Sequence, residues 1–267
     1  MVWSPRALDV DRKDSFGFVF IRGPDQTLMK PNPFTLSLGS WLSIGSPVIA
    51  ELAALSGFDW VLLDLEHGCA SEAGIPDQLR ALRGTATKGI VRVAAPDPDQ
   101  IARVLDWGAD GIMVPRIENA AMAASIVRFA CHAPRGRRGF SRTVRATDYG
   151  LKEHPDKPLI MVQIESIAGV GEAANIAMVE GVDVLFVGPA DLRHDLENNP
   201  SGESPAYEDC LDGVIAAVRS AGKESGILVR DAADVAVHLA RGFSRIAVDS
   251  DLSILRKAYQ ALLSTRP

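Results

Sequence analysis

Apolar runs that suit buried strands alternate with runs of helical periodicity along most of this sequence, and this alternation limits how the chain can fold. The strand-like runs begin with "LSLGSWL" at 36–42 and end with "RIAVDSD" at 245–251. A typical helix-like run is "DPDQIARVLDWG" at 97–108, which has an Asp-Pro start, apolar residues at helical spacing and a glycine stop. About eight strand-helix units follow one another, as expected of a (β/α)₈ barrel.

The predicted fold class is therefore α/β, a single-domain (β/α)₈ TIM barrel over 35–267. An N-terminal extension without a clear structural pattern precedes it over 1–34. A doubly wound sheet is the alternative, but no G-x-G-x-x-G follows the first strand. The length of 267 residues, 47% hydrophobic and 23% charged, suits one large α/β barrel or two small domains. The segment between Pro134 and Pro158 lacks periodicity and is predicted to be a long connection.

Charge and cysteine content argue against several classes of partner. The net charge of -6 and the pI of about 5.4 disfavour nucleic acid and anionic membranes, because both attract a basic surface. Three widely spaced cysteines, Cys69, Cys131 and Cys210, form neither a disulfide framework nor a clustered zinc site. The N-terminus has proline and alternating charge where a signal peptide needs an apolar core. We expect a soluble, cytoplasmic protein with no nucleic-acid or membrane partner.

Two polar residues interrupt the strand-like run "LIMVQIE" at 159–165. Because strand side chains alternate between faces, Met161, Gln163 and Glu165 are predicted to point to one face. A carboxylate and an amide would then share a face that should be apolar. Burying an ionised carboxylate without a partner costs several kcal/mol or more. Glu165 therefore predicts a bound ligand.

Other charged residues stand at or near the carboxyl ends of predicted strands, the face on which barrel enzymes build their active sites. With Glu165 they are Asp64, His67, Arg92, Arg116, Asp191 and Asp249. Each also has a purely structural explanation. Asp191 would cap a helix, His67 would be an ordinary loop residue, and Arg92 would be an internal ion-pair partner.

Two carboxylates without an accompanying His or Cys suit Mg²⁺ or Mn²⁺ better than zinc. We predict Glu165 and Asp191 as the metal ligands, with Gln163 reaching the bound molecule beside them. The turn "VGPADL" places backbone N–H groups at a helix N-terminus, which favours an anion such as a substrate carboxylate.

Several motifs resemble, in order and spacing, the HpcH/HpaI family of metal-dependent pyruvate aldolases over roughly 38–262. They are "GFDWVLLDLEHG", "IVRVA", "GIMVP", "PRGRRGFSR", "VQIES", "EGVDVLFVGPADL" and "SGILV". The resemblance implies a barrel enzyme that cleaves 4-hydroxy-2-oxo acids into pyruvate and an aldehyde through a metal-stabilised pyruvate enolate. It also implies a divalent cation, Mg²⁺ or Mn²⁺ with Co²⁺ as a third candidate. A homo-oligomer is expected, a hexamer of dimers that exchange their last helix.

Site residues are implied by matching positions to that family. Glu165 and Asp191 match the metal ligands, and Arg92 matches the arginine that faces the pyruvate oxygens. The catalytic histidine corresponds to His67, with Asp64 nearby to orient its ring. Substrate contacts are implied for Gln163 and for the amides of Ala190 and Asp191, which would hold the pyruvate carboxylate.

The sequence departs from the family pattern near the predicted active site. Arg116 stands where relatives often have an apolar residue, Asp249 where they typically have glycine, and "ADLRHDLE" lacks the usual glycine after its leucine. A basic loop within 135–145 is predicted to be either a solvated or interface loop or a site for an acidic substrate tail. Its arginines are Arg135, Arg137, Arg138, Arg142 and Arg145.

Two other functions remain open at this point. One is a related metal-enolate enzyme, such as an oxaloacetate decarboxylase, a macrophomate synthase or an acyl-CoA lyase; the other is a non-catalytic barrel scaffold. A lysine Schiff base is disfavoured, because every lysine is predicted in loops, turns or the final helix. These are Lys13, Lys30, Lys88, Lys152, Lys157, Lys223 and Lys257.

Overall fold

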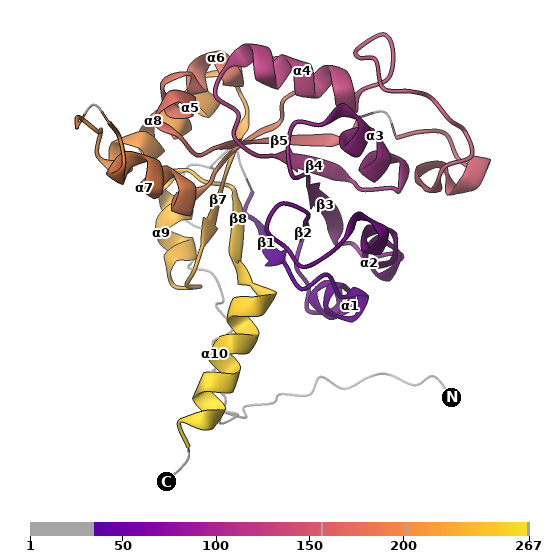
Figure 1. Cartoon of the computed structure of the whole chain (residues 1–267), viewed down its shortest axis with the longest axis horizontal. Helices are drawn as coiled ribbons and strands as arrows, with labels where there is room; N and C mark the ends of the chain where they lie inside the picture. The colour runs from indigo at the N-terminus through magenta and orange to yellow at the C-terminus, as the bar shows by residue number, and fades with distance from the viewer. Residues whose placement is uncertain (1–34, 156, 201, 266–267) are drawn as a thin grey trace, which may run out of the picture. The chain divides into compact units, whose positions relative to one another are not determined.

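The computed structural model describes residues 35–155, 157–200 and 202–265, so the predicted extension over 1–34 lies outside the described residues. Within that part of the chain, eight parallel strands close into a barrel in chain order (Figure 1). The predicted (β/α)₈ barrel is confirmed. The strands are β1 (Ser37–Leu42), β2 (Trp60–Asp64), β3 (Lys88–Arg92), β4 (Gly111–Val114), β5 (Leu159–Ile164), β6 (Val184–Val187), β7 (Glu224–Val229) and β8 (Arg245–Ser250).

Helices alternate with the strands and surround the barrel. They are α1 (Pro47–Leu55), α2 (Ile75–Ala81), α3 (Pro98–Asp106), α4 (Ala120–Ala130), α5 (Ile167–Gly171), α6 (Ala173–Ala177), α7 (Pro189–Glu197), α8 (Tyr207–Ser220), α9 (Asp234–Arg241) and α10 (Asp251–Leu263), with 3-10 turns at η1 (Glu72–Gly74) and η2 (Arg145–Gly150). The predicted start of α3 is confirmed, because the side chain of Asp97 accepts hydrogen bonds from the N–H groups of Asp99 and Gln100.

Large side chains fill the inside of the barrel. The cluster there includes Trp60, Met161 and Phe186, each fully buried. Glycines on neighbouring strands make room for two of them. A Cβ at Gly39 would lie 2.2 Å from the Trp60 ring, and one at Gly226 would lie 2.2 Å from the Phe186 ring. Trp41 and Phe186 belong to this cluster and also line the cavity at the carboxyl ends of the strands.

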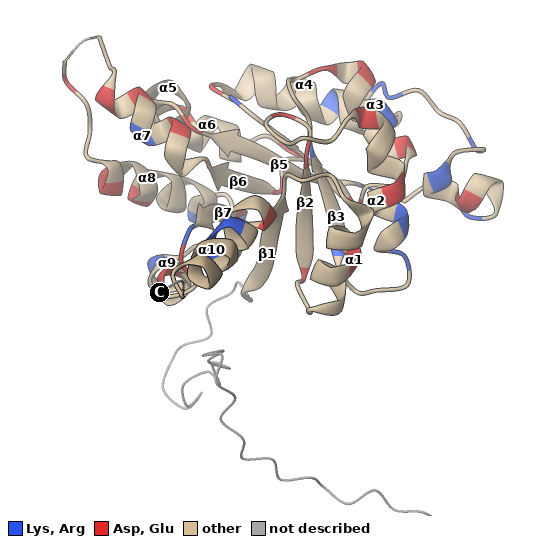
Figure 2. Cartoon of the chain, turned by 60° about the horizontal axis from the view of Figure 1, so that its bottom comes forward, with Lys and Arg blue, Asp and Glu red and all other residues tan. Residues whose placement is uncertain are grey.

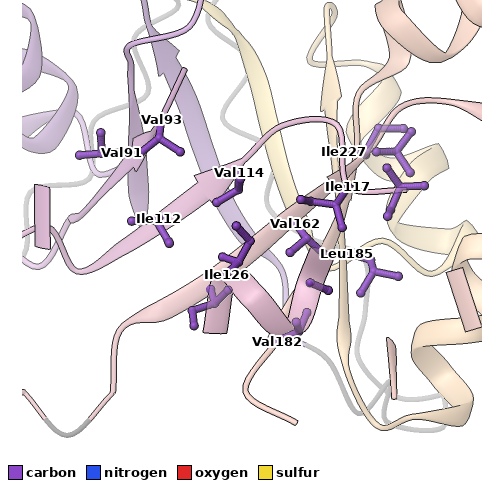
Figure 3. Packing of buried hydrophobic residues seen from close by; sticks show 14 of the residues in the cluster. Val91, Val93, Ile112, Val114, Ile117, Ile126, Val162, Val182, Leu185 and Ile227 are labelled. Carbon is purple, nitrogen blue, oxygen red and sulfur yellow. The ribbon is translucent and has the colours of Figure 1, made fainter. Parts of the chain in front are cut away.

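A second apolar layer lies between the strands and the helices. Figure 3 shows part of it, with Val91, Ile112 and Val162 on the strands and Ile126 on α4. Ile90 belongs to the inner cluster and Val91 to the outer one, so adjacent residues of β3 face opposite layers. The same alternation puts Arg92 on the inner face with Ile90.

Charged residues lie mostly on the helices and loops (Figure 2). No helix in the described residues is long and apolar enough to cross a membrane. The prediction that no lysine lies in a strand is wrong for Lys88, because β3 starts one residue earlier than the apolar run. Lys88 is nevertheless exposed at the amino end of the strand, where its Nζ donates to Asp110 at 2.9 Å.

Candidate active site

A cavity of about 370 Å³ opens at the carboxyl ends of the barrel strands. Residues from six of the strands, or from the loops and helices that follow them, line it. They include Trp41, Asp64, His67, Arg92, Phe186, Gly188, Ala190, Asp191, Arg193 and Arg230. Four of the predicted polar residues, Asp64, His67, Arg92 and Asp191, therefore line one cavity.

Arg92 is the centre of a buried ion-pair network. Asp64 and Arg92 are register partners on β2 and β3, which places their side chains next to each other. Arg92 Nε and Nη2 donate to the two carboxylate oxygens of Asp64, each at 2.8 Å, and Nη1 lies 2.8 Å from Glu66 Oε2. The guanidinium also stacks over Trp41, 4.9 Å from the ring centroid. Each of the three guanidinium nitrogens therefore has a carboxylate partner.

The electrostatics of Asp64 follow from this network. Burial alone would raise the pKa of its carboxyl group, but the hydrogen bonds and charge of Arg92 outweigh burial. Backbone N–H groups of Glu66 and His67 also donate to it. The pKa of Asp64 is held below its usual value, so its carboxylate stays ionised beside Arg92.

Glu165 follows directly after β5 and is only 6% exposed. Its Oε1 accepts the backbone N–H of Arg116 at 2.8 Å, and its Oε2 accepts from Gln163 Nε2 at 2.8 Å. Burial raises its pKa to about 7, and the nearby carboxylates of Asp191 and Glu66 act in the same direction. Glu165 forms no ion pair with a basic side chain among the described residues. Glu165 is thus a buried acid whose ionised form lacks a cation.

The turn between β6 and α7 fits closely around Glu165. A Cβ on Gly188 would lie 2.5 Å from Glu165 Oε2, so only glycine permits this approach. Pro189 starts α7, and Asp191 lies in its first turn. The turn therefore carries the Asp191 carboxylate and the first amides of α7 toward the buried carboxylate.

This donor set fits a hard divalent cation with few protein ligands. Glu165 has no basic partner, and the carboxylate of Asp191 lies near enough to raise its pKa. Mg²⁺ or Mn²⁺ commonly takes one or two carboxylates and leaves other positions to water or substrate. No group of three or more His, Cys, Asp or Glu residues with metal-binding geometry occurs in the described parts of the chain. A closed structural zinc site would need such a group.

Residues 37–258 match the family model of the HpcH/HpaI aldolase/citrate lyase family. The chain belongs to this family. It is 36% identical to the 5-keto-4-deoxy-D-glucarate aldolase of Klebsiella pneumoniae over 87% of this chain and 95% of that protein. The enzyme of the same name from Salmonella arizonae is 35% identical over 88% of this chain and 96% of that protein.

Solved structures agree with the family assignment. An HpcH/HpaI aldolase/citrate lyase family protein from Burkholderia cenocepacia has a TM-score of 0.80 at 36% identity, covering 87% of this chain and 95% of that one. Macrophomate synthase has a TM-score of 0.75 at 25% identity, covering 86% and 83%. Membership of this aldolase family makes the protein a carbon–carbon lyase and supports a divalent metal at the site.

The aldolase structure changes one expected contact. The sequence predicts that Asp64 orients the ring of His67, but both Asp64 oxygens serve Arg92 and backbone N–H groups. The His67 ring instead lies near Glu66, with Nε2 3.9 Å from Oε1, and the side chain is 68% exposed. The catalytic, substrate and metal roles of Asp64, His67, Arg92, Gln163, Glu165, Ala190 and Asp191 stay predictions.

Sequence reasoning missed three residues of this site. Glu66 binds Arg92 and approaches His67, Trp41 stacks on Arg92, and Gly188 makes room for Glu165. Glu66 is part of the motif "GFDWVLLDLEHG", and its position between Asp64 and His67 could have indicated that it belongs to the site. Trp41 carried no signal in an apolar run, because its contact depends on how β1 and β3, the two neighbours of β2, direct their side chains into the barrel.

The basic loop lies away from this cavity, and none of its five arginines lines it. Arg138 pairs with Asp106, and Arg142 Nη2 lies 3.0 Å from Glu153. Arg145 donates to the carbonyl oxygens of Trp107 and Leu79. These contacts favour the structural interpretation of the loop over binding of a substrate tail.

Proposed function

We propose that the protein cleaves 4-hydroxy-2-oxo acids into pyruvate and an aldehyde and catalyses the reverse condensation. The observation that carries this proposal is the buried Glu165, which lacks a cation and lies near Asp191. Arg92 lines the same cavity as Asp191. Glu165 and Asp191 would hold Mg²⁺ or Mn²⁺, with Co²⁺ as a third candidate. When bound, the cation supplies a Lewis acid for the negative charge that develops on the pyruvate oxygens.

Residues of the chain itself bind and orient the pyruvate half. The backbone N–H groups of Ala190 and Asp191 lie in the first turn of α7. A helix N-terminus attracts anions, so these groups would hold the pyruvate carboxylate. Arg92 would place its positive charge near the developing oxyanion, and Asp64 would fix the guanidinium there. Gln163, which donates to Glu165, would keep that carboxylate oriented and contact the substrate beside it.

Proton transfer is assigned to His67. Its exposed ring can take the proton of the 4-hydroxyl as the bond between carbons 3 and 4 breaks, and it can return the proton in condensation. Glu66 is the carboxylate near the ring and would stabilise the imidazolium. We therefore propose that Asp64 orients Arg92, and that Glu66 contacts both Arg92 and the His67 ring.

The curated relatives named above are 5-keto-4-deoxy-D-glucarate aldolases, so this compound heads the list of candidate substrates. The deciding experiment measures pyruvate release from a panel of 4-hydroxy-2-oxo acids and from oxaloacetate, with chelator and with added Mg²⁺, Mn²⁺ or Co²⁺. Metal-dependent release from hydroxy-oxo acids supports the proposal. Release from oxaloacetate alone would favour the decarboxylase alternative, and activity in excess chelator would refute the metal-dependent mechanism.

The last helix supports a homo-oligomer. α10 extends away from the barrel (Figure 1), and Asp251 is its only residue that is buried. Its apolar residues Leu252, Ile254, Tyr259, Leu262 and Leu263 are 45–66% exposed. We propose that a second copy covers this helix, in the exchanged-helix dimer and hexamer expected for the family.

The three free cysteines are consistent with a reducing cytoplasm.

A further inference from the structure

Two arginines without an assigned role, Arg193 and Arg230, also line the active-site cavity. Arg193 lies on α7, two residues after Asp191. Arg230 follows the last residue of β7. They therefore come from neighbouring strand-helix units and line the same cavity as Asp64, His67 and Arg92.

Arg193 is held in place without a carboxylate partner. Its guanidinium carbon lies 3.5 Å from the centroid of the Tyr207 ring, at the start of α8. Stacking of this kind orients a guanidinium while its N–H groups remain available around the edge. Across the described ranges of the chain, no carboxylate forms an ion pair with Arg193.

Arg230 is also incompletely paired. Its Nη1 lies 3.6 Å from Asp249 Oδ1, which is too long for a hydrogen bond, and its side chain is 61% exposed. The other oxygen of Asp249 accepts from Lys257 Nζ at 2.7 Å. Lys257 donates to the Arg230 carbonyl at 3.1 Å as well, which fixes the backbone there. Arg230 is thus anchored at its backbone, while its guanidinium keeps donors for a ligand.

The contrast with Arg92 separates two kinds of arginine in one cavity. Arg92 is buried and fully compensated by Asp64 and Glu66, whereas Arg193 and Arg230 keep their charge at the cavity lining. We propose that Arg193 and Arg230 recognise an anionic group at the end of the aldehyde half that is remote from the reacting carbonyl. This inference rests on the proposed aldolase function and assigns two specificity residues to it.

The kinetic test compares two aldehydes of equal chain length as partners for pyruvate with Mg²⁺ present. One is 4-oxobutanoate, which carries a carboxylate, and the other is its neutral methyl ester. The wild type should prefer the anion by kcat/KM. Arg193→Gln and Arg230→Gln should each reduce this preference about tenfold, through KM more than kcat, because each removes a charge-assisted hydrogen bond far from the reacting atoms.

Arg128→Gln is the matched control. Arg128 is an exposed arginine on α4 outside the cavity, and its replacement changes the net charge by the same amount. It should retain the wild-type preference. A wild type that shows no preference for the anion, or an equal preference in all four proteins, would overturn the assignment.

Binding provides a readout that does not require turnover. Trp41 lines the cavity, so its fluorescence can report binding of 2-oxoadipate and of 2-oxopentanoate, which differs only in lacking the second carboxylate. Tighter binding of 2-oxoadipate that is lost in Arg193→Gln and Arg230→Gln supports the assignment even if no aldehyde condenses. In that case the aldolase proposal alone would fail. Equal binding of the two acids by the wild type would overturn the role of the arginines.

Discussion

Replacing the buried carboxylate of Glu165 should stabilise the metal-free protein at alkaline pH. Folding raises the pKa of Glu165 from 4.5 to about 7, mainly through burial. A raised pKa means that the group's contribution to stability is fully present below pH 4.5 and is lost as the pH rises through 7. The shift of 2.5 units, 7 minus 4.5, corresponds to about 3.4 kcal/mol at 1.36 kcal/mol per unit. Glu165→Gln cannot ionise and therefore avoids this loss.

The assay is thermal unfolding of wild type and Glu165→Gln in chelator, followed by circular dichroism from pH 5 to pH 8. Their difference isolates Glu165 from the other titrating groups, and any pH-independent change in the contact with Gln163 cancels. Part of the ~3.4 kcal/mol is already lost at pH 5, so relative to the variant the wild type should lose about 2.5 kcal/mol, or roughly 5–10 °C in Tm, across this range. Added Mg²⁺ should stabilise the wild type and have little effect on the variant. A difference that does not change with pH would refute the argument.

Three further substitutions test other contacts. Arg92→Ala should lower kcat by about 10²- to 10³-fold and destabilise the fold by about 3–5 kcal/mol, because it leaves the Asp64 carboxylate buried and unpaired; near-normal turnover would remove Arg92 from the mechanism. Gly188→Ala should reduce activity at least about tenfold with an unchanged circular dichroism spectrum, because its Cβ would lie 2.5 Å from Glu165 Oε2. His67→Ala should abolish cleavage while pyruvate still quenches or enhances tryptophan fluorescence; cleavage at the wild-type rate would assign the proton transfer to another group.

Periodicity made most of the fold predictable. The apolar runs gave strands whose neighbouring residues face opposite layers, as Ile90 and Val91 do on β3. Boundaries were harder where local geometry decided them. The strand-like run "GIMVPRI" at 111–117 extends beyond the strand itself, because β4 ends at Val114, before Pro115. Proline has no N–H for the ladder, and Arg116 then takes a left-handed conformation.

The position of the site was also predictable, since parallel strands of a barrel bring their carboxyl ends to one face. Pairings within the site were not. Asp64, Glu66 and His67 are close in sequence, and their spacing does not show which carboxylate approaches the imidazole. The register of β2 and β3 determines the partner of Asp64, because Asp64 lies opposite Arg92 on the neighbouring strand and both side chains point into the barrel. Glu66 lies beyond the strand, where its carboxylate reaches both Arg92 and the His67 ring.

Arg116 shows why part of a site leaves no trace in a sequence. Its φ of 55° lies in the left-handed region, which costs a residue other than glycine about 1–2 kcal/mol. Three contacts hold this conformation: the N–H donates to Glu165 at 2.8 Å, Nη2 donates to the Ala94 carbonyl at 2.9 Å, and Nη2 lies 3.5 Å from Glu66. The strain thus occurs where the backbone supports the buried carboxylate. Every residue except proline has a backbone N–H, so the side chain at 116 could not reveal this donor, and the charged rim position predicted from the sequence contributes to the site through its main chain.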